Sequence, residues 1–153
     1  MSSSTTSHAY GVGLIALLVA VGASTIFYTG FYLPESLAKP SVPEHILKPE
    51  GTLIIDIVVG AVNEGADNYV PNKAVATLEQ NNLVKWINLD DTPHTVSPDH
   101  RTSDAYSGDF GSAGVLMPGE EYEFLFTAPQ EIHYHCQPHP WMTGTIIIEK
   151  SRF

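Results

Sequence analysis

The chain has 153 residues, 17 acidic against 7 basic side chains, a formal net charge of −10 and one cysteine. A single thiol excludes an intramolecular disulfide, a multi-thiolate zinc site and a four-cysteine iron–sulfur cluster. The acidic balance removes the usual attraction to phosphate, so we expect no nucleic-acid partner, while a hydrophobic content of 43% is enough for a packed core.

The first predicted element is an uncharged apolar segment at the N-terminus. No side chain from Met1 to Pro34 carries a formal charge, and Tyr10–Leu33 is almost wholly apolar. As a helix this run is about 36 Å long at 1.5 Å per residue, enough to cross the hydrocarbon core of a bilayer. Aromatic residues near both of its ends are typical of a membrane interface. We therefore predict a tail and transmembrane helix over residues 1–33.

A cleaved signal peptide is the main alternative to this anchor. Met1–Tyr10 contains no Lys or Arg, so the basic region of a signal peptide is missing, but small residues around Gly22–Ser24 leave cleavage open. Lys39 and Lys48 follow the apolar run and, by the positive-inside rule, place the rest of the chain in the cytoplasm. Two charges are little evidence for orientation.

Residues 34–50 are predicted to form a stalk. They contain four prolines: Pro34, Pro40, Pro43 and Pro49. Such a segment favours extended polyproline II structure, at most about 50 Å long at about 3 Å per residue. We expect it to join the anchor to a folded domain over residues 51–153, and either to space that domain from the membrane or to pack on a partner.

The domain is predicted to be all-β. Short runs rich in β-branched and aromatic residues alternate with turn signals such as Pro118-Gly119. The predicted strands are 52–62, 74–79, 83–89, 121–128, 131–136 and 143–150. Six short strands in this length favour an antiparallel sandwich or barrel. We expect Trp86, Phe124 and Met117 in its core.

Candidate metal ligands gather in two segments, Trp86–Val96 and Tyr134–Met142. They supply a thiolate, two imidazoles and a thioether: His94, Cys136, His139 and Met142. Two histidines and a cysteine with a weak axial methionine are the ligand set of blue-copper electron-transfer sites. The spacing C-x₂-H-x₂-M lets one tight turn direct three side chains at one point, and a neighbouring strand end must supply the fourth. The sequence therefore predicts one mononuclear type 1 copper.

The domain resembles a cupredoxin over roughly residues 69–149, and its loop CQPHPWM is similar to that of amicyanin and other plastocyanin-like proteins. The matching motifs are Tyr69-Val-Pro71, the WIN…PHTV segment, the stretch from Phe110 to Gly119, and YHC…HP…M…G. The resemblance implies a Greek-key β-sandwich and one-electron transfer without enzymatic bond making. It departs from the family at Thr95, because many relatives carry Asn directly after the first histidine.

The resemblance also implies partners and a location. Electrons would enter at the edge of His139, within an apolar docking rim of Pro138, Pro140 and Trp141. The partner would be a redox protein such as a cytochrome or a terminal oxidase, and the chain a free carrier or a docked subunit of a respiratory complex. Oxidised copper and a thiolate suit an extracytoplasmic face, so we predict a single-pass protein of the cell membrane with its domain outside, against the hint of the two lysines.

Two alternatives use the same motifs. The subunit II of haem–copper oxidases needs two cysteines and is excluded by the single one. A small copper enzyme, similar to nitrite reductase, would use His135 beside Cys136 to join a second copper at an oligomer interface. His133 and His100 are its other candidate ligands, but alternation along a strand makes His133 and His135 face away from Cys136.

The remaining expectation concerns acidic residues near the loops. We expect them to form a solvated rim that steers a basic partner: Asp90, Asp91, Asp99, Asp104 and Asp109.

Overall fold

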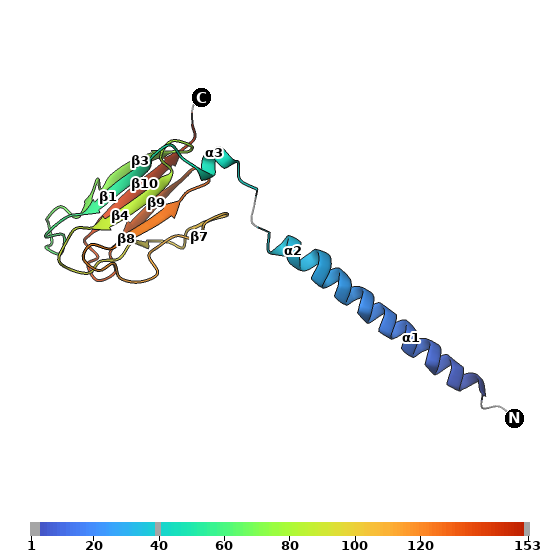
Figure 1. Cartoon of the computed structure of the whole chain (residues 1–153). Coiled ribbons are helices and arrows are strands. Elements are labelled where there is room, and N and C mark those ends of the chain that lie inside the picture. Colours follow the sequence, from blue (N-terminus) through green and yellow to red (C-terminus); the bar gives the residue numbers. More distant parts are fainter. Residues whose placement is uncertain (1–3, 39–40, 152–153) are drawn as a thin grey trace. The chain divides into compact units, whose positions relative to one another are not determined.

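The computed structural model describes residues 4–38 and 41–151, with side chains from residue 10 onward. It consists of two compact units, Met1–Lys39 and Pro40–Phe153 (Figure 1). The outermost parts of the predicted tail and domain, residues 1–3 and 152–153, and residues 39–40 of the predicted stalk lie outside the described residues.

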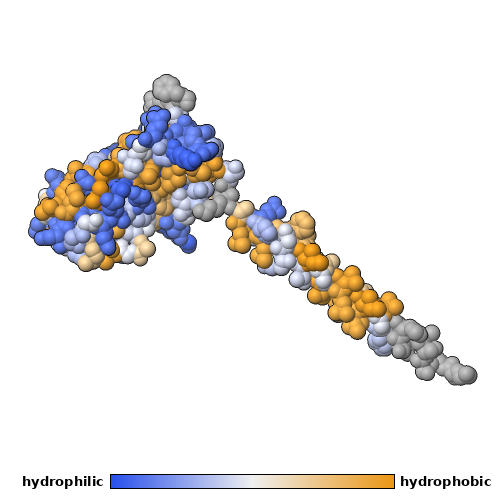
Figure 2. All heavy atoms as spheres, viewed as in Figure 1, coloured by the Kyte–Doolittle hydropathy of each residue, from blue (hydrophilic) through white to orange (hydrophobic). Residues whose placement is uncertain are grey.

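The first unit is one helical rod. It comprises the α-helix α1 (Ser4–Phe27), the π-helical turn η1 (Tyr28–Tyr32) and the short α-helix α2 (Leu33–Ser36). Thr25 and Thr29 donate their hydroxyls to the carbonyls four residues earlier, so these polar groups are satisfied within the helix. Tyr10–Ser36 is long and apolar enough to cross a membrane, a property that a signal sequence shares, and its apolar surface is exposed (Figure 2).

The second unit begins with a helical turn where we expected an extended stalk. This turn, α3 (Glu44–Leu47), packs Ile46 against the core of the domain. Asn82 Nδ2 donates to the Ile46 carbonyl at 2.9 Å, and Gly51 N–H donates to the Gln80 carbonyl at 2.7 Å. The second half of the predicted stalk therefore packs on the domain, since a partly buried side chain and backbone hydrogen bonds outweigh the extended preference of its prolines.

Two four-stranded sheets form the body of the domain (Figure 1). The first has the order β2-β1-β4-β8, with β2 (Tyr69–Val70), β1 (Thr52–Ile57), β4 (Leu83–Asn88) and β8 (Glu121–Leu125). The second has the order β3-β10-β9-β5, with β3 (Lys73–Thr77), β10 (Thr143–Glu149), β9 (Gln130–His135) and β5 (Ser97–Pro98). A small hairpin pairs β6 (Ser103–Asp104) with β7 (Gly108–Asp109).

The β-sandwich is confirmed, but its sheets are mixed and not purely antiparallel. β1 pairs with β4 in parallel, and β10 pairs with β3 in parallel, whereas β4–β8 and β9–β10 are antiparallel. The reason is the path of the chain, which crosses between the two sheets. Between β1 and β4 the chain returns through β2, which is antiparallel to β1, and through β3 of the opposite sheet, so that β4 runs in the same direction as β1.

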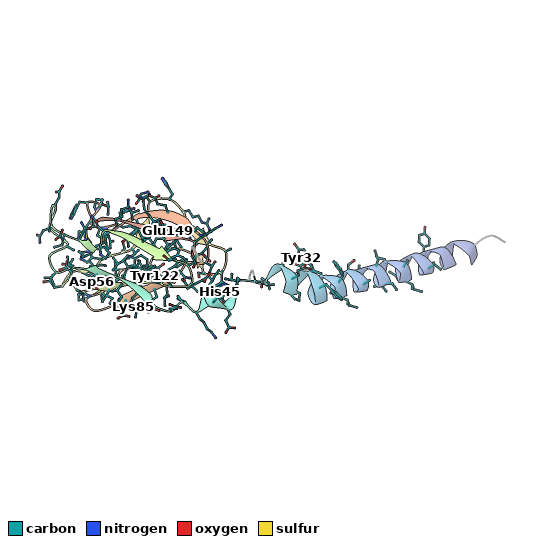
Figure 3. All side chains as sticks on the ribbon, turned by 90° about the horizontal axis from the view of Figure 1, so that it is seen from above. Tyr32, His45, Asp56, Lys85, Tyr122 and Glu149 are labelled. Atoms are coloured by element: carbon teal, nitrogen blue, oxygen red, sulfur yellow. The ribbon has the colours of Figure 1, made fainter. Side chains whose placement is uncertain are left out.

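The core lies between the sheets and is rich in aromatic side chains. Trp86 and Phe124 are buried as expected, while Met117 is 48% exposed and the expectation for it was wrong. The predicted strand 52–62 ends already at Ile57, because Gly60 adopts a positive φ of 85° and turns the chain. In Figure 3 the labelled Lys85 and Tyr122 mark the neighbouring strands β4 and β8.

Candidate metal centre

The candidate site lies where loops leave β4 and β9 at the same end of the sandwich. β4 ends at Asn88, and the loop after it carries His94. β9 ends at His135, and the loop that joins it to β10 begins with Cys136. His94 exchanges two backbone hydrogen bonds with Leu116, of 3.1 and 2.7 Å, and these fix its position against a third loop.

Three of the four predicted ligands bring their donor atoms together. Cys136 Sγ lies 3.6 Å from His94 Nδ1 and 3.6 Å from His139 Nδ1, and the two Nδ1 atoms lie 3.2 Å apart. Cys136 and His94 are buried and His139 is half-buried. Within the described parts of the chain, no other three His, Cys or carboxylate groups have donor atoms so close to one another. A thiol and two imidazoles fit copper, which accepts soft and borderline ligands.

The loop from Cys136 to Met142 is held by its own backbone. His139 N–H donates to the Cys136 carbonyl at 3.1 Å, Met142 N–H to the His139 carbonyl at 2.9 Å, and Cys136 N–H to the Met142 carbonyl at 3.1 Å. The Met142 side chain is fully buried. Three predicted ligands therefore come from one closed turn, as their spacing indicates.

Thr95 links the two ligand loops, at the position where the sequence departs from the cupredoxin pattern. Its N–H donates to Cys136 Sγ at 3.4 Å, and its hydroxyl accepts from Gln137 N–H at 2.9 Å. Its carbonyl accepts from the Tyr69 hydroxyl at 2.6 Å. A threonine hydroxyl and N–H group thus join the two ligand loops.

A buried carboxylate stands behind His94, and sequence reasoning missed it. Asp90 was expected in a solvated rim, but it is 2% exposed and its Oδ2 lies 2.8 Å from His94 Nε2. Its Oδ1 accepts from the N–H groups of Gly60 at 2.9 Å and Asp91 at 3.0 Å. Burial raises the pKa of Asp90, but the hydrogen bonds from Gly60, His94 and Asp91 lower the pKa further, to below its usual range.

Asp104 is a second exception to the expected acidic rim. It is 5% exposed and accepts hydrogen bonds from Thr127 and from a neighbouring turn. The other three aspartates of the expected rim are exposed: Asp91, Asp99 and Asp109. The only sequence signal for Asp90 was its position four residues before a candidate ligand.

The electrostatics of the site keep its outer histidine neutral. Burial lowers the pKa of His139, the neighbouring His94 lowers it further, and the charge of Asp90 opposes both in part. Neutral imidazole is the form that binds a metal. His139 also lies against Trp141, with ring centroids 5.4 Å apart, and Pro138, Pro140 and Trp141 are exposed around it.

The histidines proposed for a second metal point away from this site. His133 is exposed and His135 half-buried, while Tyr134 and Cys136 between and after them are buried, so the predicted alternation is confirmed. His135 Nδ1 lies 2.6 Å from Asp99 Oδ1, and His133 Nδ1 lies 3.1 Å from Thr145 Oγ1. His100 is exposed in the adjacent loop.

Comparison with known proteins places this geometry in a family. Residues 58–149 match the family of copper binding proteins described as plastocyanin/azurin. The amicyanin of Paracoccus denitrificans is 36% identical over 67 residues, which are 43% of this chain and 48% of that protein. The chain thus spans about half the length of this curated relative.

Solved structures show the same fold. A structure described as a novel purple cupredoxin from Nitrosopumilus maritimus has a TM-score of 0.52 and 26% identity, covering 63% of this chain and 99% of that one. A copper-containing nitrite reductase from Thermus scotoductus SA-01 also has a TM-score of 0.52, with 21% identity over 73% of this chain and 27% of that one, a likeness of fold alone.

The family match covers more than half of the chain and includes both loops of the candidate site. Its known chemistry agrees with the donor set that the fold brings together, one thiol and two imidazoles. The chain therefore belongs to the plastocyanin/azurin family of copper binding proteins, and its His–Cys–His donor set fits one copper.

Proposed function

We propose that this protein is a membrane-anchored one-electron carrier whose type 1 copper is held by His94, Cys136 and His139, with Met142 as a weak axial ligand. The observation that carries the proposal is the triangle of Sγ and two Nδ1 atoms, with sides of 3.6, 3.6 and 3.2 Å. When bound, copper supplies a reversible one-electron couple.

The chain's own residues would keep that couple fast. Thr95 and the closed turn from Cys136 to Met142 hold the donor atoms with hydrogen bonds that involve no metal. A frame fixed in this way changes little between two oxidation states, so little reorganisation accompanies each transfer. This supports electron transfer rather than substrate chemistry, which needs an open coordination position.

Electron entry is proposed at the exposed edge of His139. Pro138, Pro140 and Trp141 surround it and offer an apolar contact that requires little desolvation of charge. The exposed acidic residues and the net charge of −10 would steer a basic redox protein, such as a cytochrome or a terminal oxidase, at low salt. Either a free carrier or a docked subunit of a respiratory complex fits this surface.

Copper loading tests the site. We expect one copper per chain and an intense visible band from thiolate-to-copper charge transfer. Cys136→Ser should abolish the band, Met142→Leu should shift it, and Met117→Leu, at an exposed methionine of an adjacent loop, should leave it unchanged. Copper binding without a band, or a band that survives in Cys136→Ser, would contradict the proposal.

The anchor and its orientation are proposed from the uncharged rod Tyr10–Ser36. We expect the full chain in the membrane fraction, resistant to alkaline extraction, and a chain without residues 1–39 in the soluble fraction, still able to bind copper. Added protease should reach the domain only from the extracytoplasmic face. Cleavage from the cytoplasmic face alone, or a mature protein that lacks the helix, would refute this part.

A small copper enzyme is the second candidate function. The feature that favours it is His135, which is next to Cys136, half-buried at the surface and 2.6 Å from Asp99. This function requires two coppers per chain, one of them lost in His135→Ala, and turnover of nitrite or nitric oxide. One copper in both the natural chain and the variant would leave only the electron carrier.

A further inference from the structure

The carboxylate of Asp90 is buried, and its Oδ2 lies 2.8 Å from Nε2 of His94, the ring nitrogen that faces away from Cys136. We propose that Asp90 is a positioning residue for the copper centre, which fixes the His94 tautomer and holds a negative charge that favours oxidised copper. This inference rests on the proposed role of His94 as a ligand. It adds to that role a residue that controls the reduction potential.

With the His94 proton on Nε2, the contacts of Asp90 suit a carboxylate and leave an amide of the same shape with one unfavourable contact. Oδ2 lies 2.8 Å from His94 Nε2, and Oδ1 accepts from the N–H groups of Gly60 at 2.9 Å and Asp91 at 3.0 Å. An amide has a single acceptor atom, so it would turn its NH₂ group either toward two N–H donors or toward His94. The Asp90 N–H is itself held by Asn88 Oδ1 at 3.0 Å, which fixes the backbone.

The first consequence concerns the proton of His94. A neutral imidazole carries one N–H, and the partner of one ring nitrogen decides which atom keeps it. An ionised carboxylate can only accept, so Asp90 keeps the proton on Nε2 and the lone pair on Nδ1, the atom that lies 3.6 Å from Cys136 Sγ. His94 is fully buried, so no water competes for this hydrogen bond. A carboxylate behind a ligating histidine also raises its strength as a donor.

The second consequence concerns charge. With cupric ion, one thiolate and one carboxylate the formal charges of the site cancel, whereas the cuprous state leaves a net negative charge among buried groups. A buried charge without a partner is costly, so the Asp90 carboxylate stabilises the oxidised state more than the reduced one. An electron supplied by a redox partner therefore enters against this charge, which lowers the reduction potential.

The test compares Asp90→Asn with Glu149→Gln, which makes the same change of net charge at an exposed residue at the far end of β10. In the copper-free protein, ¹⁵N NMR should find the His94 proton on Nε2 in the natural chain and in Glu149→Gln. In Asp90→Asn the fraction with the proton on Nδ1 should rise. This readout needs no metal, and a proton on Nδ1 in the natural chain would already overturn the positioning role.

The copper-loaded proteins test the charge. Asp90→Asn should shift the equilibrium between the two oxidation states at least tenfold toward reduced copper, which is a rise of 59 mV for one electron. Glu149→Gln should stay within twofold of the natural chain, and Asp90→Glu, which restores the charge, should recover most of the shift. A shift below twofold in Asp90→Asn, or an equal shift in Glu149→Gln, would overturn the proposed effect of the Asp90 charge on the reduction potential.

The failures of the two proposals can be told apart. A chain that gives no thiolate band with copper refutes the proposed function, while the NMR measurement still decides the role of Asp90 in positioning His94. A chain with a normal band and an unchanged potential in Asp90→Asn refutes the charge effect and leaves the proposed function standing. If Asp90→Asn does not fold, the tautomer in the natural chain still decides the positioning role, and the potential of Asp90→Ser, which also removes the charge, decides the charge effect.

Discussion

At each end of strand β4 a buried asparagine forms hydrogen bonds with the backbone of neighbouring loops, and the two ends differ in which loops these are. Asn82 precedes the strand, Asn88 ends it, and both are fully buried. Asn82 donates to the carbonyls of Ile46 and Phe126, and it accepts from Glu79 N–H. Each of these bonds ties one loop or turn to the strand.

Asn88 repeats this pattern at the other end. It donates to the carbonyls of Thr92 and Leu116, and it accepts from Asp90 N–H. Here, however, the tied loops carry His94, whose Nδ1 faces Cys136 Sγ. At the Asn82 end the buried amide completes a closed structure, while at the Asn88 end it holds donor atoms that face one another. The same chemistry is thus structural at one end and positions the candidate copper ligands at the other.

The largest effect is expected from Gly144→Ala at the copper end. Gly144 lies opposite Tyr134 in the pair of β10 and β9, and a Cβ there would overlap the Tyr134 ring. Because the ring is fully buried, we expect a loss of about 3 kcal/mol of unfolding free energy, measured by denaturant titration, together with weaker copper binding. Gly114→Ala, with open space at its Cβ, is the control, and an equal loss there would contradict this explanation.

The next prediction compares the two asparagines directly. Asn82→Ala and Asn88→Ala each remove three hydrogen bonds between a buried amide and the backbone, so each should cost about 2 kcal/mol of unfolding free energy in the copper-free protein. Only Asn88→Ala should also weaken copper binding, measured by competition with a chelator of known affinity. If Asn82→Ala weakened it equally, the distinction between the two ends would be wrong.

A smaller effect should depend on pH at the Asn82 end. Asp104 accepts from the backbone and hydroxyl of Thr127, next to Phe126, and from Tyr106 and Ser107. Burial raises the pKa of Asp104, but these hydrogen bonds lower it further, so its folded pKa lies below its unfolded one. Its contribution to stability is therefore full at neutral pH and is lost as pH falls below about 4, through the folded pKa.

The measurement compares Asp104→Asn with the natural chain. We expect Asp104→Asn to be less stable by about 1 kcal/mol at pH 7, with the gap closing on acidification below about pH 4. The visible copper band should be the same in both proteins at pH 7. Asp109→Asn, at an exposed aspartate, is the control. If its stability difference from the natural chain closed on acidification in the same way, the effect would not be specific to Asp104.

The smallest effect is expected between the two ends. Lys85, in the middle of β4, pairs with Glu121 at 2.7 Å and Glu123 at 2.8 Å on the outer face of the sheet (Figure 3). Hydrogen bonds to these carboxylates raise the pKa of Lys85, so an acylating reagent should modify it more slowly than exposed Lys73. Lys85→Met should leave copper binding and the denaturation midpoint near those of the natural chain, because surface ion pairs contribute little.

The sequence predicted the parts of this molecule that depend on local pattern. Runs rich in β-branched and aromatic residues identified the longer strands of both sheets but not the two-residue strands β2 and β5. The spacing of Cys136, His139 and Met142 in one turn needed only local geometry. That His94 would join them required the sandwich, which the resemblance to cupredoxins supplied. Its Nδ1 lies 3.6 Å from Cys136 Sγ although the two residues are 42 positions apart.

The errors arose where the partner lies far away in the chain. Asp90 and Asp104 were expected to be solvated. The N–H groups that bind their carboxylates belong to Gly60 and Thr127, which are distant in the sequence, so no local pattern indicates these hydrogen bonds. Ile46 was expected in an extended stalk. Its carbonyl accepts from Asn82, 36 positions later, and the local sequence does not indicate this hydrogen bond. Met117 was expected in the core, since nothing local indicates that its loop turns outward. The parallel pairing of β3 with β10 likewise depends on the whole path of the chain.

The parallel pairing of β3 with β10 also affects when the second sheet can form during synthesis. β10, residues Thr143–Glu149, forms the centre of its sheet between β3 and β9, and it follows both of them in the chain. Until β10 is synthesised, β3 lacks its neighbour and the Cys136–Met142 turn lacks the strand that follows it. The apolar helix α1 is therefore synthesised before β10 can pair with β3 and β9, so the two units of the chain form their structures at different stages of synthesis.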